Sequence, residues 1–260
     1  MSNKVKIREE AKKLNPIDDL MFRKMAEDKD FCQEILRVIL EDDKLIVLES
    51  IPQWMGANLQ GRSVILDAKC VKGDGTQIDI EVQKADDDDH QRRVRYNGAV
   101  LTTNIANPGI RFKNVPNVCM VFISRFDIFR GNFPLYHVDR RVRETGTVVN
   151  NGFEEVYVNT EIKNNSDVSE LMEVFVKDDI YNSKFPKTSD GKRRYKETEG
   201  GLNAMCEIME RLTADERNKI NRLTILLLKD KRYDDLERAA QDEEFQKKLM
   251  DELLSKEIDN

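Results

Sequence analysis

Residues Arg62–Lys84, RSVILDAKCVKGDGTQIDIEVQK, contain two alternating segments on either side of a Gly-Asp-Gly turn. Alternation with a period of two predicts β-strands, and the turn predicts that the two strands form an antiparallel hairpin. In the second segment the apolar residues are Ile78, Ile80 and Val82, and the polar ones are Asp79, Glu81 and Gln83. With Gly73–Gly75 as a three-residue loop, Asp67 of the first strand lies directly opposite Glu81 of the second.

The facing pair of acids indicates a metal site. Like charges directly opposite each other destabilise a sheet, and a divalent cation held between Asp67 and Glu81 is the simplest compensation. The geometry depends on the turn, because a two-residue Asp74-Gly75 turn shifts the register by one residue and separates the pair. In that register Asp79, which shares a face with Glu81, is the alternative ligand.

A carboxylate pair of this kind suits the hydrolysis of a phosphodiester. Mg²⁺ prefers hard oxygen ligands and keeps several waters, so two or three carboxylates and a main-chain carbonyl are enough to hold it. The ion then positions a water, takes up charge on the phosphate and stabilises the leaving oxygen. The competing interpretation is structural, with Asp67 and Glu81 on an exposed sheet face and Lys69 and Arg62 as their ion-pair partners.

Several segments, in this order and spacing, are similar to those of a known family. They are Asn15–Lys24, which contains Asp19, Phe22 and Arg23; the hairpin with Asp67 and Glu81-Val82-Gln83; the Arg/Tyr helix Gln91–Tyr96; and the apolar strand Val118–Ser124. Together they resemble the PD-(D/E)XK nuclease superfamily, and within it the PD-(D/E)XK family transposases, also called recombination-promoting nucleases. The likeness covers roughly residues 14–180.

The resemblance implies a set of metal ligands. Asp67 and Glu81 become the catalytic ligands of Mg²⁺, for which Mn²⁺ can substitute, and the carbonyl of Val82 becomes the main-chain ligand. Asp19 occupies the position of an acid in the family's first helix, where it can add a ligand through water. The alternative for Asp19 is that it or Asp18 caps that helix, as acids in a first turn commonly do.

Gln83 is the main departure from the superfamily pattern, which has Lys at this position. The resemblance makes Gln83 the third catalytic residue, because its amide can orient water, although it carries no charge. Lys84 follows directly and points to the opposite face, so it does not replace the missing lysine. Lys69, on the same face as Asp67 and Glu81, is the better candidate for a compensating cation.

A basic block follows the hairpin and indicates a nucleic-acid partner. Residues 90–145 contain ten Lys or Arg and three Asp or Glu, although the whole chain has a net charge of −6. Within the Arg/Tyr helix, Arg92, Arg93 and Tyr96 are the implied nucleic-acid-binding residues, and Arg92 and Tyr96 share a face at a spacing of four. The competing interpretation is an ordinary solvated surface.

The sequence predicts an α/β fold: a PD-(D/E)XK restriction-endonuclease-like core, with a mixed central sheet flanked by helices, and an α-helical C-terminal appendage. The domains expected are a nuclease-like domain over residues 1–180, a linker over 181–196 and a helical region over 197–260. Helices are predicted over 17–40, 90–106 and 167–176, strands over 45–51, 62–84, 118–124, 133–142 and 155–162, and a loop over 177–194.

Composition limits the remaining classes of protein. No apolar run reaches the ~18 residues that cross a membrane, and the N-terminus lacks the apolar core of a signal peptide, which favours a cytoplasmic protein. The hypothesis is a Mg²⁺-dependent DNA endonuclease that serves recombination, mobile elements or defence. The alternative is a weak or inactive nuclease fold that binds nucleic acid or protein. Homo-oligomerisation through the C-terminal helices, with the apolar stripe Ile220–Leu228, is a further expectation.

Overall fold

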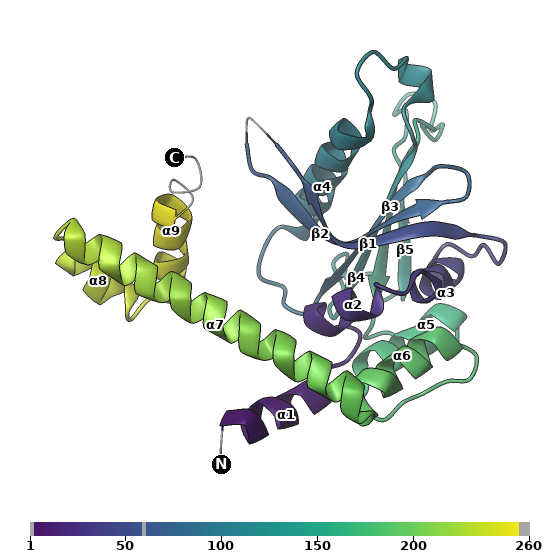
Figure 1. The fold of residues 1–260 in the computed structure, drawn as a ribbon. Helices are drawn as coiled ribbons and strands as arrows, with labels where there is room; N and C mark the ends of the chain where they lie inside the picture. Colours follow the sequence, from purple (N-terminus) through teal and green to yellow (C-terminus); the bar gives the residue numbers. More distant parts are fainter. Residues whose placement is uncertain (1–2, 59–60, 255–260) are drawn as a thin grey trace. The chain divides into compact units, whose positions relative to one another are not determined.

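The computed structural model describes residues 3–58 and 61–254, which form two compact units (Figure 1). One unit comprises residues 12–202, and the other comprises residues up to 11 together with those from 203 onward. The helices are α1 (Asn3–Lys13), α2 (Asp19–Met25), α3 (Lys29–Ile39), α4 (His90–Ile105), α5 (Asp167–Val176), α6 (Pro186–Glu197), α7 (Glu199–Lys229), α8 (Tyr233–Ala239) and α9 (Glu243–Leu254), with a 3₁₀ turn η1 at Phe112–Asn114. The strands are β1 (Val47–Gly56), β2 (Val64–Lys72), β3 (Gln77–Gln83), β4 (Val118–Ser124), β5 (Leu135–Val138) and β6 (Phe153–Asn159).

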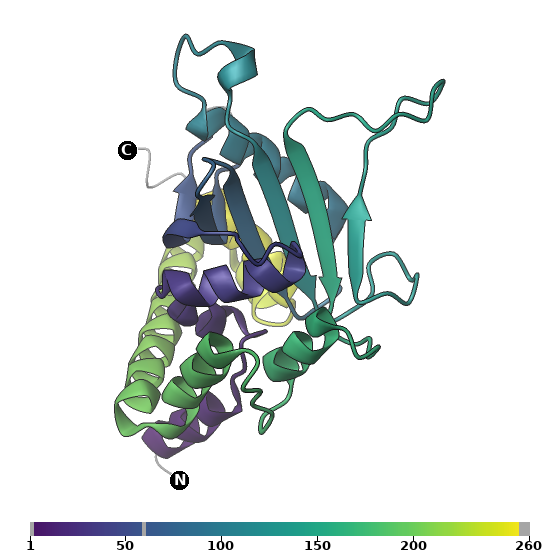
Figure 2. The same cartoon turned by 90° about the vertical axis from the view of Figure 1, so that its right-hand side faces the viewer.

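The strands of the larger unit form one mixed sheet. Within the described residues its order is β1-β2-β3-β4-β6-β5, and β3, β4 and β6 run parallel while the other neighbours are antiparallel. Every residue of β4 is buried, as expected of a central strand covered on both faces. Figure 2 shows β5 at one edge, with the long connection to β6 extending away from the sheet. The sheet and its helices are the α/β architecture that the sequence predicts.

Helices cover both faces of the sheet. On one face Val94 and Leu101 of α4 pack with Met120 and Phe122 of β4. On the other, the Cys32 thiol of α3 lies 3.2 Å from the Ser50 hydroxyl, which in turn lies 3.7 Å from the Cys70 thiol of β2. Hydrophobic burial on both faces therefore fixes the positions of β2 and β3, which carry the acids of the hairpin.

The predicted strand 118–124 and the predicted helix 167–176 agree with β4 and α5 to the residue. The predicted helix 17–40 is two helices, α2 and α3, separated where the charged residues 27–30 interrupt the apolar pattern. The prediction of a loop over 177–194 is wrong from Pro186 onward, because α6 begins there. Pro186 lies in the first turn of α6, and Thr188, Lys192 and Tyr195 are buried.

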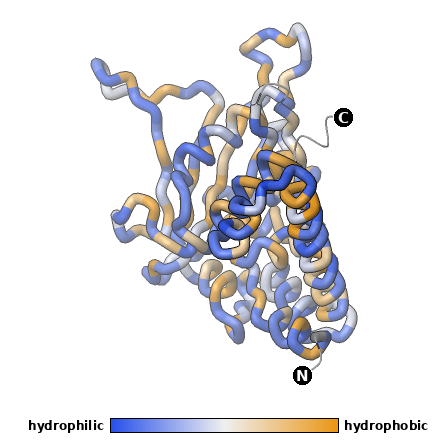
Figure 3. Tube along the Cα trace, turned by 90° about the vertical axis from the view of Figure 1, so that its left-hand side faces the viewer, coloured by the Kyte–Doolittle hydropathy of each residue, from blue (hydrophilic) through white to orange (hydrophobic). Residues whose placement is uncertain are grey.

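The smaller unit has its own apolar cluster. Leu223 and Leu227 of α7 pack with Ala239 of α8 and Leu249 of α9, and hydrophobic positions recur along these mostly hydrophilic helices in Figure 3. The stripe at 220–228 is therefore used partly inside the chain, and self-association through it stays a prediction. Among the described residues, no helix is both long enough and apolar enough to span a membrane.

Candidate active site

The β2–β3 hairpin has the predicted register. Ala68 pairs with Ile80 and Val71 with Gln77, and the loop is the three-residue Gly73–Gly75, with Gly75 at φ +91°. The backbone N–H of Lys72 donates to the carbonyl of Thr76 over 2.9 Å and closes the loop. Glycine tolerates this left-handed conformation without a steric penalty, which is why the loop has this length.

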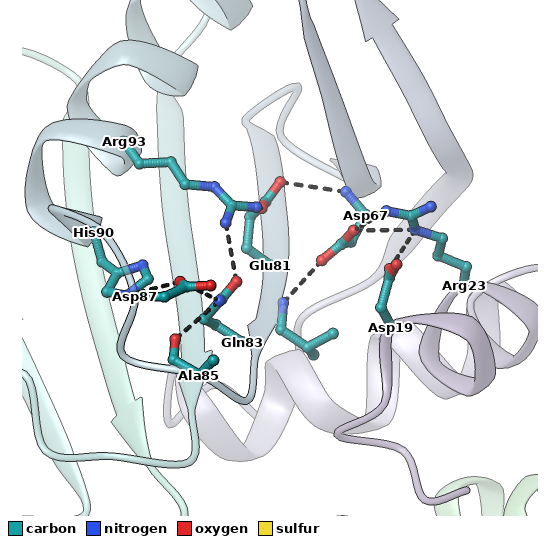
Figure 4. A network of polar contacts seen from close by, with 10 residues as sticks. Asp19, Arg23, Asp67, Glu81, Gln83, Ala85, Asp87, His90 and Arg93 are labelled. Atoms are coloured by element: carbon teal, nitrogen blue, oxygen red, sulfur yellow. Dashed lines mark hydrogen bonds and ion pairs between the residues drawn. The ribbon is translucent and has the colours of Figure 1, made fainter. Parts of the chain in front are cut away.

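The backbone ladder stops at Ala68 and Ile80, and two carboxylates continue it. The N–H of Asp67 donates to Glu81 Oε1 over 3.3 Å, and the N–H of Val82 donates to Asp67 Oδ2 over 3.0 Å (Figure 4). Each acid thus accepts a backbone hydrogen bond from the other's strand where the strands separate. Asp67 and Glu81 are 3% and 2% exposed, so the predicted pair is formed in a buried setting and not on an open sheet face.

Two arginines neutralise the pair. Arg23 of α2 donates to Asp67 Oδ1 from Nε at 3.1 Å and from Nη2 at 2.9 Å, and it also forms an ion pair with Asp19. Arg93 of α4 donates from Nη2 to Glu81 Oε2 over 2.7 Å. Asp67 and Glu81 are therefore paired with Arg23 and Arg93, and not with Lys69 and Arg62, the partners that a structural interpretation of the acids requires.

Lys69 does not supply the compensating charge. Its Nζ lies 5.5 Å from the centre of the Trp54 ring, and burial lowers its pKa while Glu49 raises it. Arg93 is a cation that contacts both Glu81 and Gln83, because its Nη1 also donates to Gln83 Oε1 over 2.9 Å. Alternation alone puts Lys69 on the correct face of the strand but does not show which cation reaches the acids.

The buried surroundings of these acids disfavour their ionised forms, even with both arginines present. Burial, followed by the charge of Asp67, raises the pKa of Glu81 to about 8, and Arg93 opposes this. Burial and Asp67 also raise the pKa of Asp19 to about 7. Asp79, fully buried, has no hydrogen-bond partner for either oxygen among the described residues, and burial raises its pKa well above the usual range. A divalent cation beside Asp67 and Glu81 would favour their ionised forms and so lower these pKa values.

The carbonyl of Val82 points toward Asp67. The N–H of Val82 donates to Asp67, and the N–H and C=O of one residue in a strand point to the same side. The next carbonyl, that of Gln83, points to the opposite side and accepts the N–H of Arg125 over 2.9 Å. Val82 therefore directs its carbonyl toward the position that the family resemblance requires of a main-chain ligand.

Asp19 lies beside the pair. The helix cap before it, Asp18, makes no capping hydrogen bond with its side chain, and instead accepts from Lys84 Nζ over 2.6 Å. The Asp19 carboxyl forms an ion pair with Arg23, which also binds Asp67, and the charge of Asp67 raises the pKa of Asp19. Its position is compatible with a ligand that acts through water, and Lys84 is engaged away from the acids.

Gln83 lies at the end of β3 with every polar atom of its amide engaged. Its oxygen accepts from Arg93, and its nitrogen donates to the Ala85 carbonyl over 2.9 Å and to Asp87 Oδ1 over 3.2 Å. The amide is thus held between α4 and the acidic run that precedes it (Figure 4).

A groove runs along α4, and Arg93, which contacts Glu81, lies in its wall. The groove has a volume of about 740 Å³ between the start of β2 and α4. The basic and aromatic residues that line it are Arg62, Arg92, Arg93, Arg95 and Tyr96. Arg92 is 78% exposed in its side chain and pairs with Asp89 at 3.1 Å. The Tyr96 hydroxyl donates to the carbonyl of Arg62 and accepts from Asn58 over 3.0 Å, so Tyr96 ties the groove walls together.

The residues present fit a hard divalent cation. In the described parts of the chain no three His, Cys, Asp or Glu side chains surround a common metal position. Two carboxylates, a carbonyl and bound waters are nevertheless an ordinary set for Mg²⁺, and Asp67, Glu81 and the Val82 carbonyl are the residues that would hold it.

Sequence reasoning gave no role to Arg23 at the acids. Its partner Asp67 is 44 residues away in the chain, so neither periodicity nor spacing points to the contact. The one local signal is the four-residue spacing of Asp19 and Arg23, which places the two on one helix face. His90, at the start of α4, packs its ring 5.0 Å from that of Phe126 and 5.5 Å from that of Phe122.

Comparison with known proteins agrees with this geometry. No curated protein and no solved structure matches the chain. The family model of the PD-(D/E)XK nuclease family transposases matches residues 16–243, which extends the likeness beyond 180 through α7 and α8. The chain belongs to the PD-(D/E)XK nuclease family transposases.

Proposed function

We propose that this protein is a metal-dependent DNA endonuclease, with Mg²⁺ as its ion and Mn²⁺ as a substitute. The observation that carries the proposal is the opened end of the β2–β3 hairpin, where Asp67 and Glu81 are buried together beside a groove lined by arginines. The family supports a role in recombination, mobile elements or defence, and we place the activity in the cytoplasm.

The residues have the following proposed roles. Asp67, Glu81 and the Val82 carbonyl hold the cation directly, and Asp19 holds one of its waters. The bound ion supplies charge stabilisation at the phosphate and lowers the pKa of a bound water. Gln83 completes the motif at the end of β3, at the position of the family's lysine.

DNA lies along the groove in this proposal. Arg92 reaches solvent from the groove wall and contacts the phosphate backbone, and Arg93 connects that wall to Glu81. Tyr96 shapes the groove through its hydrogen bonds to Arg62 and Asn58. Phosphate contacts of this kind give affinity that falls with salt concentration and is largely independent of base sequence.

A non-catalytic binding protein is the second candidate. The observation that favours it is the amide of Gln83, which has no charge and no free donor. Such a protein uses the groove but needs no metal. Thermal stabilisation by Mg²⁺ or Mn²⁺ that Asp67→Ala removes supports the nuclease, and its absence supports the binding protein.

The direct test is nicking of supercoiled plasmid by the full chain with Mg²⁺ or Mn²⁺. We expect wild type to nick, and Asp67→Ala and Glu81→Ala each to lose activity by roughly a thousandfold, since each removes a ligand to the ion that stabilises transition-state charge. Asp74→Ala is the matched control, because it removes an acid from the same hairpin at the exposed turn. A wild type that nicks no better than the two variants would contradict the proposal.

A further inference from the structure

The guanidinium of Arg93 bridges two residues of the motif. Nη2 donates to Glu81 Oε2 over 2.7 Å and Nη1 donates to Gln83 Oε1 over 2.9 Å. The Arg93 side chain is 35% exposed, so it lies between the buried acids and the open groove. A planar guanidinium presents donors in a fixed fork, and here two of them are committed to the first and last residues of Glu81-Val82-Gln83.

Gln83 is oriented toward this guanidinium and not toward a water. The two hydrogens of its amide nitrogen are used by the Ala85 carbonyl and by Asp87. The amide oxygen, which remains, accepts from Arg93. The side chain therefore has no donor left for an attacking water, whereas its oxygen fixes the direction of a positive charge.

Arg92 provides the natural contrast. It is the adjacent residue of α4, but its side chain is 78% exposed and its ion-pair partner is Asp89, the N-cap residue of the same helix. Both arginines line the groove, but of the two it is Arg93 that contacts Glu81 and Gln83 in the described part of the chain. Substitutions at Arg92 and Arg93 can therefore distinguish contact with a backbone phosphate from an effect on the reacting phosphate.

We propose that Arg93 is the cation that acts at the scissile phosphate in place of the motif's lysine, and that Gln83 is a positioning residue that holds Arg93 there. The inference rests on the proposed nuclease function. In the hydrolysis, the oxygen of a water forms a bond to phosphorus and one ester P–O bond breaks. The water gives its proton to solvent, and the leaving oxygen takes one up. Negative charge gathers on the phosphate oxygens, and one terminal nitrogen of Arg93 donates to them while the other stays on Gln83.

The first test compares Arg93→Gln with Arg92→Gln in single-turnover cleavage at saturating DNA, with DNA affinity measured separately in Ca²⁺. Arg93→Gln is expected to lower the cleavage rate about 10²- to 10³-fold, the usual cost of removing a preorganised donor, with little loss of affinity. Arg92→Gln is expected to weaken DNA binding and to lower the saturated rate far less than Arg93→Gln does. A loss of affinity alone in Arg93→Gln would make Arg93 a backbone contact and overturn the proposal.

A second, independent test moves the positive charge from position 93 to position 83. Adding Gln83→Lys to Arg93→Gln restores a cation at the motif's lysine position, and we expect it to recover most of the lost rate. Arg93→Lys keeps the charge without the fork and should lie between wild type and Arg93→Gln. Failure of the double variant to recover any rate, while its melting temperature matches wild type, would show that the charge is not what the site lacks.

A readout without catalysis separates this inference from the proposed function. In calorimetric titration with Mn²⁺ at pH 8, Arg93→Gln should bind the ion about tenfold more tightly, because it removes a cation that competes for Glu81. Arg92→Gln should bind as wild type does. A wild type that cuts no DNA would overturn both proposals, and the titration would then still show whether Arg93 occupies the ion's place. Cleavage by wild type and Arg93→Gln at equal rates would leave the nuclease standing and remove only the role of Arg93.

Discussion

The two ends of the β2–β3 hairpin satisfy their backbone hydrogen-bonding groups in different ways. At the closed end, backbone groups pair regularly from Ala68–Ile80 to Val71–Gln77, and a glycine at φ +91° completes the turn. At the open end the same two strands separate, and the carboxylates of Asp67 and Glu81 accept the N–H groups that have lost their ladder partners. The closed end is held by apolar burial and backbone hydrogen bonds, and the open end by charge.

The open end shows how a fold can stabilise two buried carboxylates that are available for function. A buried carboxylate is costly unless it is hydrogen bonded and paired. Here each acid accepts one backbone N–H and one guanidinium, so it is held in place without a metal. The charged partners are Arg23 of α2 and Arg93 of α4, which lie outside the sheet. Both bind the carboxylate side chains and not the backbone of the hairpin.

The largest effect on stability is expected at the closed end. Ile80 is fully buried, and Ile80→Ala should lower the free energy of unfolding by about 2–5 kcal/mol, through lost transfer energy and a residual cavity. Chemical denaturation measures it. Ile65→Ala on β2 is the control, since Ile65 is 53% exposed, and it should change stability by about 0.5 kcal/mol or less. Equal losses at the two positions would show that burial does not distinguish them.

The pH dependence should come from the open end. Glu81 has its pKa raised from 4.5 to about 8 and Asp19 from 3.8 to about 7, so the folded state binds more protons than the unfolded state between those values. The free energy of unfolding should therefore fall as pH rises from about 4.5 to about 8. For a buried group such as Glu81 the slope is about 1.4 kcal/mol per pH unit.

Denaturation at a series of pH values checks this, with Asp67→Asn as the matched variant. Asp67 is a cause of both raised values, so the variant should show a flatter profile. Mg²⁺ should stabilise wild type more at pH 8 than at pH 6, because a metal ligand must lose its proton. A profile for wild type that rises through this range would mean that the acids are ionised without cost in the folded protein.

The sequence predicts much of this comparison, and the part that it misses is non-local. The turn residues at 73–75 and the period-two pattern are local properties that leave two registers open, and the structure has the one with the three-residue loop. The contact of Arg23 with Asp67 joins a helix to a strand 44 residues later, and the loop predicted over 177–194 is helix α6 from Pro186 onward. That segment is polar and contains Gly191, so its intrinsic helix propensity is weak. Burial of Tyr195 and of Lys192, whose Nζ donates to the Val174 carbonyl over 3.0 Å, stabilises it as a helix through tertiary contacts.

The arginine of α2 should matter more than an ordinary surface cation. Arg23→Gln leaves Asp67 with one fewer charged donor at a position where the acid is nearly buried, and we expect a loss of about 1–2 kcal/mol near neutral pH. Lys24→Gln is the control, because Lys24 pairs with Glu27, whose side chain is 54% exposed, and such pairs contribute about 0.5 kcal/mol or less. Thermal or chemical denaturation of the two variants side by side gives the answer. Equal small losses would mean that solvent replaces Arg23 at the acid.

The smallest effects on the free energy of unfolding are expected from exchanging glycine at two positions with positive φ, and their signs should be opposite. Gln53 of β1 lies between Pro52, the partner of Ala68, and Trp54, the partner of Leu66, and it has φ +52° where the strands open. Left-handed backbone costs a non-glycine residue roughly 1–2 kcal/mol, and glycine adds roughly 0.5–1 kcal/mol of unfolded-state entropy. Gln53→Gly should therefore stabilise the protein by up to about 1 kcal/mol.

At the closed end, Gly75→Ala should lower the free energy of unfolding by about 1 kcal/mol. No neighbouring atom lies within 4 Å of the added Cβ, so the loss comes from backbone strain alone. Paired denaturation curves resolve the two signs. Destabilisation by Gln53→Gly would show that the glutamine side chain contributes more to the opened end than its backbone strain costs.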